Sequence, residues 1–102
     1  MRLEFTTAAE LELDEAIAYY NAQRSGLGYE FAAEARLAAE RIVEYPHAWQ
    51  PLDDDVRRCR LNRFPYGLVY AIEGDVILVI AVMYLRRKPD YWRDRLMTMR
   101  SR

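Results

Sequence analysis

The feature that most constrains the fold is an unbroken apolar run from Val76 to Val82. It reads Val-Ile-Leu-Val-Ile-Ala-Val and lacks the polar alternation of a half-exposed strand. Such a run predicts a central strand buried on both faces, so other structure must pack on the sheet. Even when extended to Leu85, the run has about ten residues, half the length that a membrane-spanning helix needs.

Two amphipathic helices are predicted before the strands. Thr7 and Glu10 have the spacing of a capping box, in which the two side chains satisfy free amides at the start of a helix. The apolar stripe of this helix, in steps of three and four residues, is Ala9, Leu13, Ala16, Ile17 and Tyr20. After a break over residues 21–28, a second helix begins around residues 27–29 and ends at Pro46, because proline cannot donate the next helical hydrogen bond. Its stripe is Phe31, Ala35, Ala38, Ile42 and Tyr45.

Short strands are predicted on either side of this helical hairpin. They are Leu3–Phe5, Val56–Arg63, Leu68–Ile72 and Val76–Tyr84. A three-residue loop with a central glycine, Glu73–Asp75, joins the last two strands. Residues 47–55 predict an acidic loop, and a short helix is expected from Asp90 to about Met97. The order β-α-α-β-β-β-α predicts one α+β domain over residues 1–102, in which a small, antiparallel-rich sheet packs against the helical hairpin.

The charged residues divide unevenly along the chain. Residues 1–55 contain 12 acidic and 4 basic side chains, a net charge of −8. Residues 56–102 contain 11 basic and 4 acidic side chains, a net charge of +7. This asymmetry indicates a basic working face on an acidic scaffold. A second interpretation stays open, in which acidic residues merely decorate exposed helices and basic residues decorate strands.

Several kinds of chemistry are not expected from this sequence. The lone histidine, His47, cannot form the multi-ligand sites that zinc or non-haem iron needs, so no metal is predicted. Cys59 has no histidine near it in its strand, which disfavours a Cys–His nucleophile. A single cysteine and the absence of a signal peptide fit a reducing cytosol. We therefore expect a cytoplasmic protein that needs no cofactor and does not enter the membrane.

The remaining candidate residues are basic or aromatic. They are Arg57, Arg58, Arg60, Arg63, Arg86, Arg87, Lys88, Tyr91, Trp92, Arg93 and Arg95. Arg58 and Arg60 are two residues apart in a predicted strand, so they point to the same side. Guanidinium groups beside flat rings suit phosphate contact and base stacking, and they suit a protein interface equally well. A third interpretation makes Tyr91 and Trp92 a C-terminal lid folded onto the sheet.

An ordered set of five segments carries a resemblance to a known family. The segments are Ala9-x-x-Glu12-Leu13-x-Glu15-Ala16-x-x-Tyr19-Tyr20, Gly26-Leu27-Gly28-x-x-Phe31, Ile42-x-x-x-Pro46, Arg60-Leu61-x-Arg63-Phe64-Pro65-Tyr66-Gly67-Leu68-Val69-Tyr70 and Ile80-Ala81-Val82-x-x-x-Arg86-Arg87-x-Pro89-x-Tyr91-Trp92. At these spacings, and in the predicted order of elements, the set resembles the RelE/ParE superfamily of type II toxin–antitoxin toxins, in the branch called plasmid stabilisation proteins. The resemblance runs from about Phe5 to Arg95.

This resemblance implies a RelE/ParE-like fold, a compact sheet packed on a helical hairpin. It also implies a cognate antitoxin, a small protein encoded beside the toxin that wraps it and masks its active surface. A hetero-oligomer with the antitoxin is therefore expected. RelE-like members cleave mRNA on the ribosome, whereas ParE-like members poison DNA gyrase.

The ribonuclease branch implies a set of catalytic positions in this chain. Carried over by position, they are Arg58 and Arg60 on the second strand, Arg86 or Arg87 after the last strand, and Tyr91 or Trp92 as the terminal aromatic residue. An arginine that opens the third strand in that branch falls on Gly67, and this is a departure. Loss of one phosphate-stabilising group costs on the order of 100-fold in rate, by analogy with a lost oxyanion donor.

The leading hypothesis is a ParE-like toxin that acts by binding, with its basic C-terminal half contacting gyrase or antitoxin. The first alternative is a ribosome-dependent mRNA endonuclease with the catalytic set Arg58, Arg60, Arg86, Arg87 and Tyr91. The second alternative is a module that binds antitoxin and has lost toxicity, with which Gly67 is compatible. In each case the partner-binding or nucleic-acid-binding positions are Arg57, Arg63, Lys88, Trp92, Arg93 and Arg95.

Overall fold

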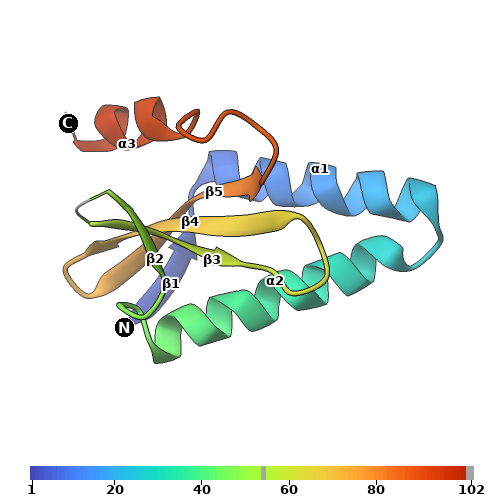
Figure 1. Ribbon diagram of the computed structural model, residues 1–102, viewed down its shortest axis with the longest axis horizontal. Helices are drawn as coiled ribbons and strands as arrows, with labels where there is room; N and C mark the ends of the chain where they lie inside the picture. The colour runs from blue at the N-terminus through green and yellow to red at the C-terminus, as the bar shows by residue number, and fades with distance from the viewer. Residues whose placement is uncertain (54, 101–102) are drawn as a thin grey trace.

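The computed structural model describes residues 1–53 and 55–100. The elements are β1 (Arg2–Phe5), α1 (Thr7–Gln23), α2 (Leu27–Glu44), β2 (Gln50–Asp53), β3 (Val56–Arg60), β4 (Tyr66–Glu73), β5 (Val76–Tyr84) and α3 (Arg93–Arg100). The strands form one sheet in the order β1-β5-β4-β3-β2, with the α1–α2 hairpin on one face and α3 on the other (Figure 1). The predicted α+β class and the packing of the sheet on the helical hairpin are confirmed.

The apolar run Val76–Val82 forms most of β5. It lies between β4, to which it is antiparallel, and β1, to which it is parallel. Ile77, Val79, Ile80 and Ala81 have no exposed surface, so the prediction of an interior strand is confirmed. Among the described residues, no helix is both long and apolar enough to cross a membrane.

The strand β2 is an addition to the predicted order. It lies within residues 47–55, where an acidic loop was expected, and it pairs with β3 at the edge of the sheet. Pro51 and the acidic residues near it obscured this strand, because they are unusual in a central strand and tolerated only at an edge. The following strand is shorter than predicted and ends at Arg60, so Arg63 lies in the turn before β4.

The turn between β4 and β5 is tighter than predicted. Glu73 pairs directly with Val76, which leaves Gly74 and Asp75 as a two-residue hairpin loop. At the start of α1, Thr6 is the capping residue instead of Thr7, and its hydroxyl accepts a hydrogen bond of 3.1 Å from the Ala9 amide. Both differences are shifts of one residue, the usual uncertainty in an element boundary.

The two helices of the hairpin approach closely at Gly28. A Cβ atom at this position would lie 2.1 Å from the carbonyl oxygen of Ile17, so only glycine fits without moving α1. The Gly28 amide donates a 2.7 Å hydrogen bond to the side-chain oxygen of Asn21. Asn21 is part of α1, which continues to Gln23 and so extends into the predicted break over residues 21–28. The second helix ends at Glu44, just before Pro46, as predicted.

Each face of the sheet has its own apolar core. Toward the hairpin, Leu68, Tyr70 and Ile77 pack against Phe31 and Ile42. On the other face, the buried residues are Val56, Val69, Ala71, Ile80, Ala81, Met83, Trp92 and Leu96. Trp92 is 1% exposed, which confirms the interpretation of this residue as a lid on the sheet. The helix α3 begins at Arg93, after Trp92, and not at Asp90.

Candidate functional site

The strand register brings most of the candidate residues to one end of the sheet, where β3 and β5 end and β4 begins. Arg60 pairs with Gly67, and Gly67 pairs with Met83. One residue away, Tyr66 pairs with Tyr84 on the opposite face. The segment after β5 starts here, and the α1–α2 hairpin extends beyond this end (Figure 1). Arginines and tyrosines that are distant in the sequence therefore meet at this end.

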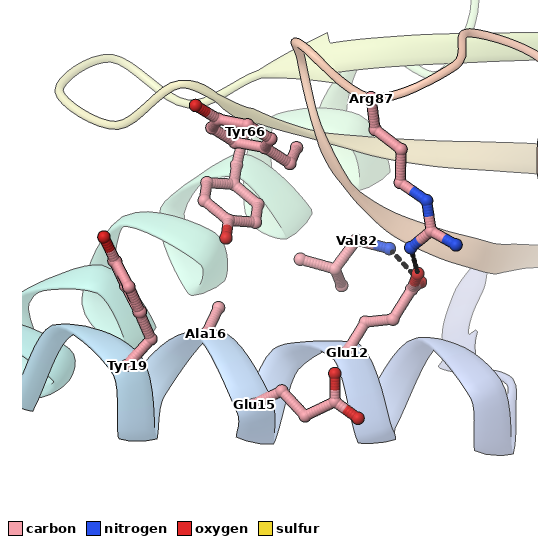
Figure 2. A pocket seen from close by; sticks show the side chains of 8 residues that line it. Glu12, Glu15, Ala16, Tyr19, Tyr66, Val82 and Arg87 are labelled. Carbon is pink, nitrogen blue, oxygen red and sulfur yellow. Dashed lines mark hydrogen bonds and ion pairs between the residues drawn. The ribbon is translucent and has the colours of Figure 1, made fainter.

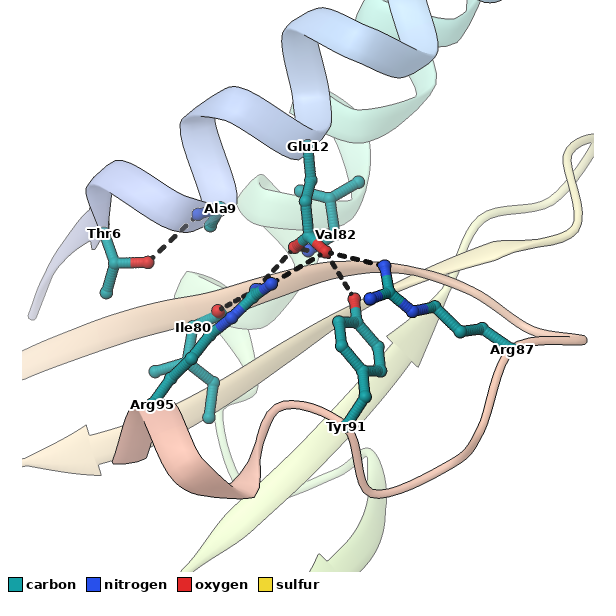
Figure 3. Close-up of polar contacts among 8 residues, drawn as sticks. All are labelled: Thr6, Ala9, Glu12, Ile80, Val82, Arg87, Tyr91 and Arg95. Atoms are coloured by element: carbon teal, nitrogen blue, oxygen red, sulfur yellow. Dashed lines mark hydrogen bonds and ion pairs between the residues drawn. The ribbon is translucent and has the colours of Figure 1, made fainter. Parts of the chain in front are cut away.

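A cluster around Glu12 connects α1 to the C-terminal segment (Figure 3). The Tyr91 hydroxyl donates a 2.7 Å hydrogen bond to one carboxylate oxygen of Glu12. The Arg95 guanidinium donates to both oxygens, at 2.7 and 3.1 Å, and Arg87 forms an ion pair at 3.6 Å. We refer to Glu12, Arg87, Tyr91 and Arg95 as the Glu12 cluster. Because Arg87 and Arg95 face one carboxylate, the cluster has a formal charge of +1.

The Glu12 cluster also completes the edge of β5. The pairing of β1 with β5 ends at Phe5 and Val79, so beyond Val79 the edge of β5 that faces away from β4 has no strand beside it. The Val82 amide donates a 3.0 Å hydrogen bond to Glu12, and the Ile80 carbonyl accepts a 3.1 Å hydrogen bond from Arg95. Two side chains thus replace the missing strand, which is why these charges tolerate partial burial.

The aromatic ring of Tyr91 is enclosed by cations. The Arg87 guanidinium lies 3.8 Å from the ring centroid and the Arg95 guanidinium lies 5.0 Å from it. Burial and the hydrogen bond to Glu12 raise the pKa of the Tyr91 hydroxyl well above its usual value. The neutral hydroxyl is therefore strongly favoured, and its proton is already engaged.

Arg58 occupies the space that Gly67 leaves open. A Cβ atom on Gly67 would lie 2.9 Å from Cγ of Arg58, so the stem of the arginine crosses β4 at the glycine. The Arg58 guanidinium donates a 2.8 Å hydrogen bond to the neutral side chain of Gln50. Its Nε atom is buried and has no hydrogen-bond partner among the described residues. Burial, and then the charge of Arg60, lower the pKa of Arg58. Gly67 stands where the ribonuclease branch has an arginine, and in this chain the side chain of Arg58 fills the space beside the glycine.

Three other candidate arginines have partners within the chain. Arg57 donates a 2.9 Å hydrogen bond to the carbonyl of Trp49. Arg63 forms ion pairs with Glu30 at 3.2 Å and Glu34 at 3.6 Å, and so joins its turn to α2. Arg93 pairs with Asp53 at 2.6 Å and joins α3 to β2. These contacts give each of the three a role in holding the fold.

The last candidates differ in their exposure. Arg60 and Arg86 are exposed and form no ion pair among the described residues. Lys88 is exposed and lies 4.0 Å from Asp90. Trp92 is buried, and its ring nitrogen donates a 2.9 Å hydrogen bond to the Pro89 carbonyl. In this conformation a partner could reach Arg60, Arg86 and Lys88 directly, whereas Trp92 is covered.

A groove lined by tyrosines lies beside the Glu12 cluster, between α1 and the adjoining ends of β4 and β5 (Figure 2). It has two connected compartments of about 500 and 260 Å³. The larger compartment is lined by Tyr19, Tyr20, Pro65, Tyr66, Tyr84 and Arg87. The smaller one shares Tyr19, Tyr66, Tyr84 and Arg87 and adds Glu12, Glu15, Ala16 and Val82. We refer to both compartments together as the tyrosine groove.

Comparison with protein families gives a match over residues 3–89. The matching family is described as "ParE toxin of type II toxin-antitoxin system, parDE". The chain belongs to this family. The match includes the tyrosine groove and Glu12, and it ends before Tyr91, so the C-terminal part of the Glu12 cluster lies beyond it.

A solved structure supports the fold of this ParE-family chain. It is described as "Chromosomal ParDE TA system from P. aeruginosa" and is similar with a TM-score of 0.74. The similarity covers 84% of this chain and 97% of that chain, at 18% sequence identity. At this identity the comparison shows a shared fold. No curated protein sequence matches the chain.

Sequence reasoning missed the residue that organises the site. Glu12 was noted only within the family motif, because an acidic residue on an amphipathic helix is usually a solvated surface group. Its side chain is 12% exposed in the structure, and glutamates are seldom buried without a partner. The signal in the sequence is its spacing, three residues after Ala9 and four before Ala16 of the apolar stripe. Tyr19 and Tyr66 were also motif positions only, and Tyr84 was placed at the end of the last predicted strand. The grouping of the three depends on the pairing of β4 with β5.

Proposed function

We propose that this ParE-family toxin acts by binding DNA gyrase in the cytoplasm, and that a cognate antitoxin neutralises it. The observation that carries the proposal is the state of Tyr91. Its hydroxyl donates to Glu12 and its ring lies between Arg87 and Arg95, so a residue that the ribonuclease alternative assigns to catalysis is already engaged. The site is better suited to holding a partner than to transferring protons.

The chemistry of RNA cleavage supports this preference. Attack by a 2′-hydroxyl needs a group that accepts its proton, charge stabilisation for the phosphorane and an acid for the leaving oxygen. Arginine stays protonated, so it is a poor base. Glu12, the nearest carboxylate to Tyr91, already accepts hydrogen bonds from Val82, Tyr91 and Arg95. A raised pKa also makes Tyr91 a weaker acid.

The Arg58–Arg60 pair is suited to binding. The two side chains lie on the same face of β3, close enough for Arg60 to affect the pKa of Arg58. Arg58 hydrogen-bonds to a neutral side chain, and Arg60 has no ion pair among the described residues. Two neighbouring cations without a carboxylate favour an anionic partner surface. We propose that this pair, with Arg86, contributes to the target interface.

The test combines two assays on the same purified toxin. We expect inhibition of gyrase supercoiling and no codon-dependent cuts in mRNA on ribosomes. Tyr91→Phe separates the mechanisms, because it keeps the ring between the arginines and removes only the hydroxyl. Under the proposal this variant retains growth inhibition; under the ribonuclease alternative it loses cleavage.

Three outcomes would overturn the proposal. One is an mRNA cut pattern that disappears in Arg60→Ala and Tyr91→Phe, which supports the endonuclease alternative. Another is normal growth on induction of folded toxin without antitoxin, which supports a module that only binds antitoxin. Growth arrest with unchanged supercoiling also contradicts gyrase as the target.

A further inference from the structure

The tyrosine groove has exposed aromatic walls. Tyr19 is 57% exposed on α1, and Tyr84 is 38% exposed at the end of β5. Behind them, Tyr20 stacks on Phe31 with 5.4 Å between ring centroids, and Tyr66 lies 5.4 Å from Tyr84. The floor is therefore fixed by the core, while the rim presents two large rings to solvent. Exposed aromatic rings on a rigid floor are typical of protein-binding sites.

The tyrosine hydroxyls in the groove are unused. Within the described part of the chain, the hydroxyls of Tyr19, Tyr20, Tyr66 and Tyr84 make no hydrogen bond, whereas those of Tyr70 and Tyr91 do. A tyrosine with its ordinary pKa is neutral at physiological pH, and burial followed by neighbouring tyrosines raises the pKa of Tyr20 and Tyr66 further. Each neutral phenol can donate and accept, so the groove combines apolar surface with polar tips.

One end of the groove contains a carboxylate that has no ion pair among the described residues. The Glu12 carboxylate is compensated by Arg87 and Arg95. Glu15, one helical turn further along α1, is exposed and has no ion pair among the described residues. The hairpin around it, residues 7–44, contains 8 acidic and 3 basic side chains, a net charge of −5. A cationic side chain is therefore the complementary group for this end.

We propose that the tyrosine groove receives a segment of the antitoxin. In this segment an apolar side chain packs between Tyr19 and Tyr84, and an adjacent lysine or arginine pairs with Glu15. The inference rests on the antitoxin partner in the proposed function and adds the surface and the chemistry of the segment. Tyrosine hydroxyls along the groove then bind the backbone of the segment.

Nucleic acid fits this groove less well. Phosphates entering the smaller compartment would face Glu15, whose charge no ion pair compensates among the described residues. The arginine that lines both compartments, Arg87, is already paired with Glu12 and stacked on Tyr91. The Arg58–Arg60 pair lies on the other face of the sheet, so an anionic target and a cationic antitoxin segment can occupy separate surfaces.

The aromatic part of the inference is tested with Tyr19→Ala. Alanine is the best helix former, so this exposed position on α1 should remain folded, as circular dichroism will verify. With the purified full-length antitoxin, we expect calorimetry to give a Kd at least about tenfold weaker than for the unmodified toxin. The matched control is Tyr29→Ala on α2, which removes a tyrosine that is 72% exposed and lies outside the groove. Its Kd should be unchanged.

The charge part is tested with Glu15→Arg. We expect weakening of about tenfold or more, whereas Asp14→Arg changes the net charge equally at the neighbouring exposed position outside the groove and should have little effect. Each lysine and arginine of the antitoxin is then replaced singly by glutamate. One of these antitoxin variants should bind Glu15→Arg more tightly than it binds the unmodified toxin.

The inference fails if Tyr19→Ala and Glu15→Arg bind antitoxin as tightly as the unmodified toxin. It also fails if they keep antitoxin binding but lose gyrase inhibition, because the groove then belongs to the target. If analytical ultracentrifugation shows that the toxin alone dimerises and that Tyr19→Ala abolishes the dimer, the groove belongs to a second copy of the chain and the inference fails. Antitoxin binding is measured without gyrase, so failure of the gyrase proposal leaves this test intact.

Discussion

Glu12 shows how one side chain can connect three parts of a small fold. Its two oxygens accept hydrogen bonds from a strand amide, a phenol and a guanidinium that come from β5, the C-terminal segment and α3. Each donor would otherwise need water or another partner at a partly buried site. The same carboxylate therefore helps position Arg87 and Tyr91, which the ribonuclease alternative would use for chemistry.

Neutralising Glu12 should destabilise the fold. In Glu12→Gln the side chain keeps its shape but loses its charge. The amide NH2 group can only donate, and so can the Arg95 guanidinium, so one of the hydrogen bonds between them is lost. We expect a loss of about 2–3 kcal/mol in unfolding free energy, measured by urea denaturation. The control Asp14→Asn, at an exposed position on the same helix, should change stability by less than about 0.5 kcal/mol. Equal effects of the two variants would contradict the role of Glu12.

Gly67 and Arg58 should be energetically coupled. A methyl group at Gly67 meets Cγ of Arg58 at 2.9 Å, and overpacking of this kind costs about 1–3 kcal/mol. In an Arg58→Ala background the contact is absent, so Gly67→Ala should cost little or become stabilising through its effect on the unfolded chain. A double-mutant cycle by urea denaturation should give a coupling of about 0.5–3 kcal/mol. Additive effects would show that the packing of the Arg58 side chain does not depend on a glycine at position 67.

Two tyrosines should make the fold sensitive to alkali. Burial raises the pKa of Tyr70 to about 12, and burial with the Glu12 hydrogen bond raises the pKa of Tyr91 further. An unfolded tyrosine ionises near pH 10, so the stabilising contribution is complete below about pH 10 and is lost as the pH rises toward the folded value. Unfolding free energy should therefore fall between about pH 10 and 12. Tyr70→Phe should flatten this dependence; an unchanged slope would contradict the assignment of Tyr70.

At the scale of elements, α3 is held mainly by one side chain. Trp92 is 1% exposed and packs with Leu96 against Val69, Ile80 and Met83. Trp92→Ala should therefore cost about 3–5 kcal/mol by thermal or urea unfolding. Arg93→Ala removes an ion pair whose two side chains are each 45% exposed, and should cost at most about 1 kcal/mol. A larger loss for Arg93→Ala than for Trp92→Ala would overturn this ranking.

The elements that were predictable from sequence are those with a strong periodic or apolar signal. β5 was identified from the run Val76–Val82, and the two long helices from stripes of apolar residues. The strand β2 was not, because four residues with a proline at a sheet edge do not differ from a loop in composition. The start of α3 was placed too early because Trp92 precedes the helix instead of beginning it.

The candidate site was only partly predictable for a related reason. The arginines were found by composition, but their separation into ion-paired and unpaired members depends on tertiary contacts such as Arg63 with Glu30. The tyrosine groove depends on the register between β4 and β5, which places Tyr66 beside Tyr84. A single sequence gives no direct measure of that register, because the unbroken apolar pattern of β5 suits either face.

At the scale of the whole molecule, the two halves of the charge distribution lie on different structures. The acidic half forms the helical hairpin, and the basic half forms the strands β3–β5 and the C-terminal segment. The interpretation in which acidic residues merely decorate exposed helices and basic residues decorate strands describes where most of the charges are. It does not account for Glu12, Arg58 or Arg95, which are partly buried and have specific surroundings. The uneven charge distribution therefore gives the molecule two surfaces, each of which suits a partner of a different charge.

Binding of antitoxin should raise the stability of this small chain. A chain of 102 residues buries only about two-thirds of its unfolded surface, so its own stability is expected to be modest. Antitoxin at 100 times its Kd adds about 2.7 kcal/mol if it binds only the folded toxin. For a domain of this size that corresponds to a rise in Tm of at least about 10 °C.

Differential scanning calorimetry over a series of antitoxin concentrations should show this rise for the unmodified toxin and for Tyr29→Ala. At the same concentrations, Tyr19→Ala should show a smaller rise because its site is less occupied. An equal rise for Tyr19→Ala would place the antitoxin elsewhere on the molecule.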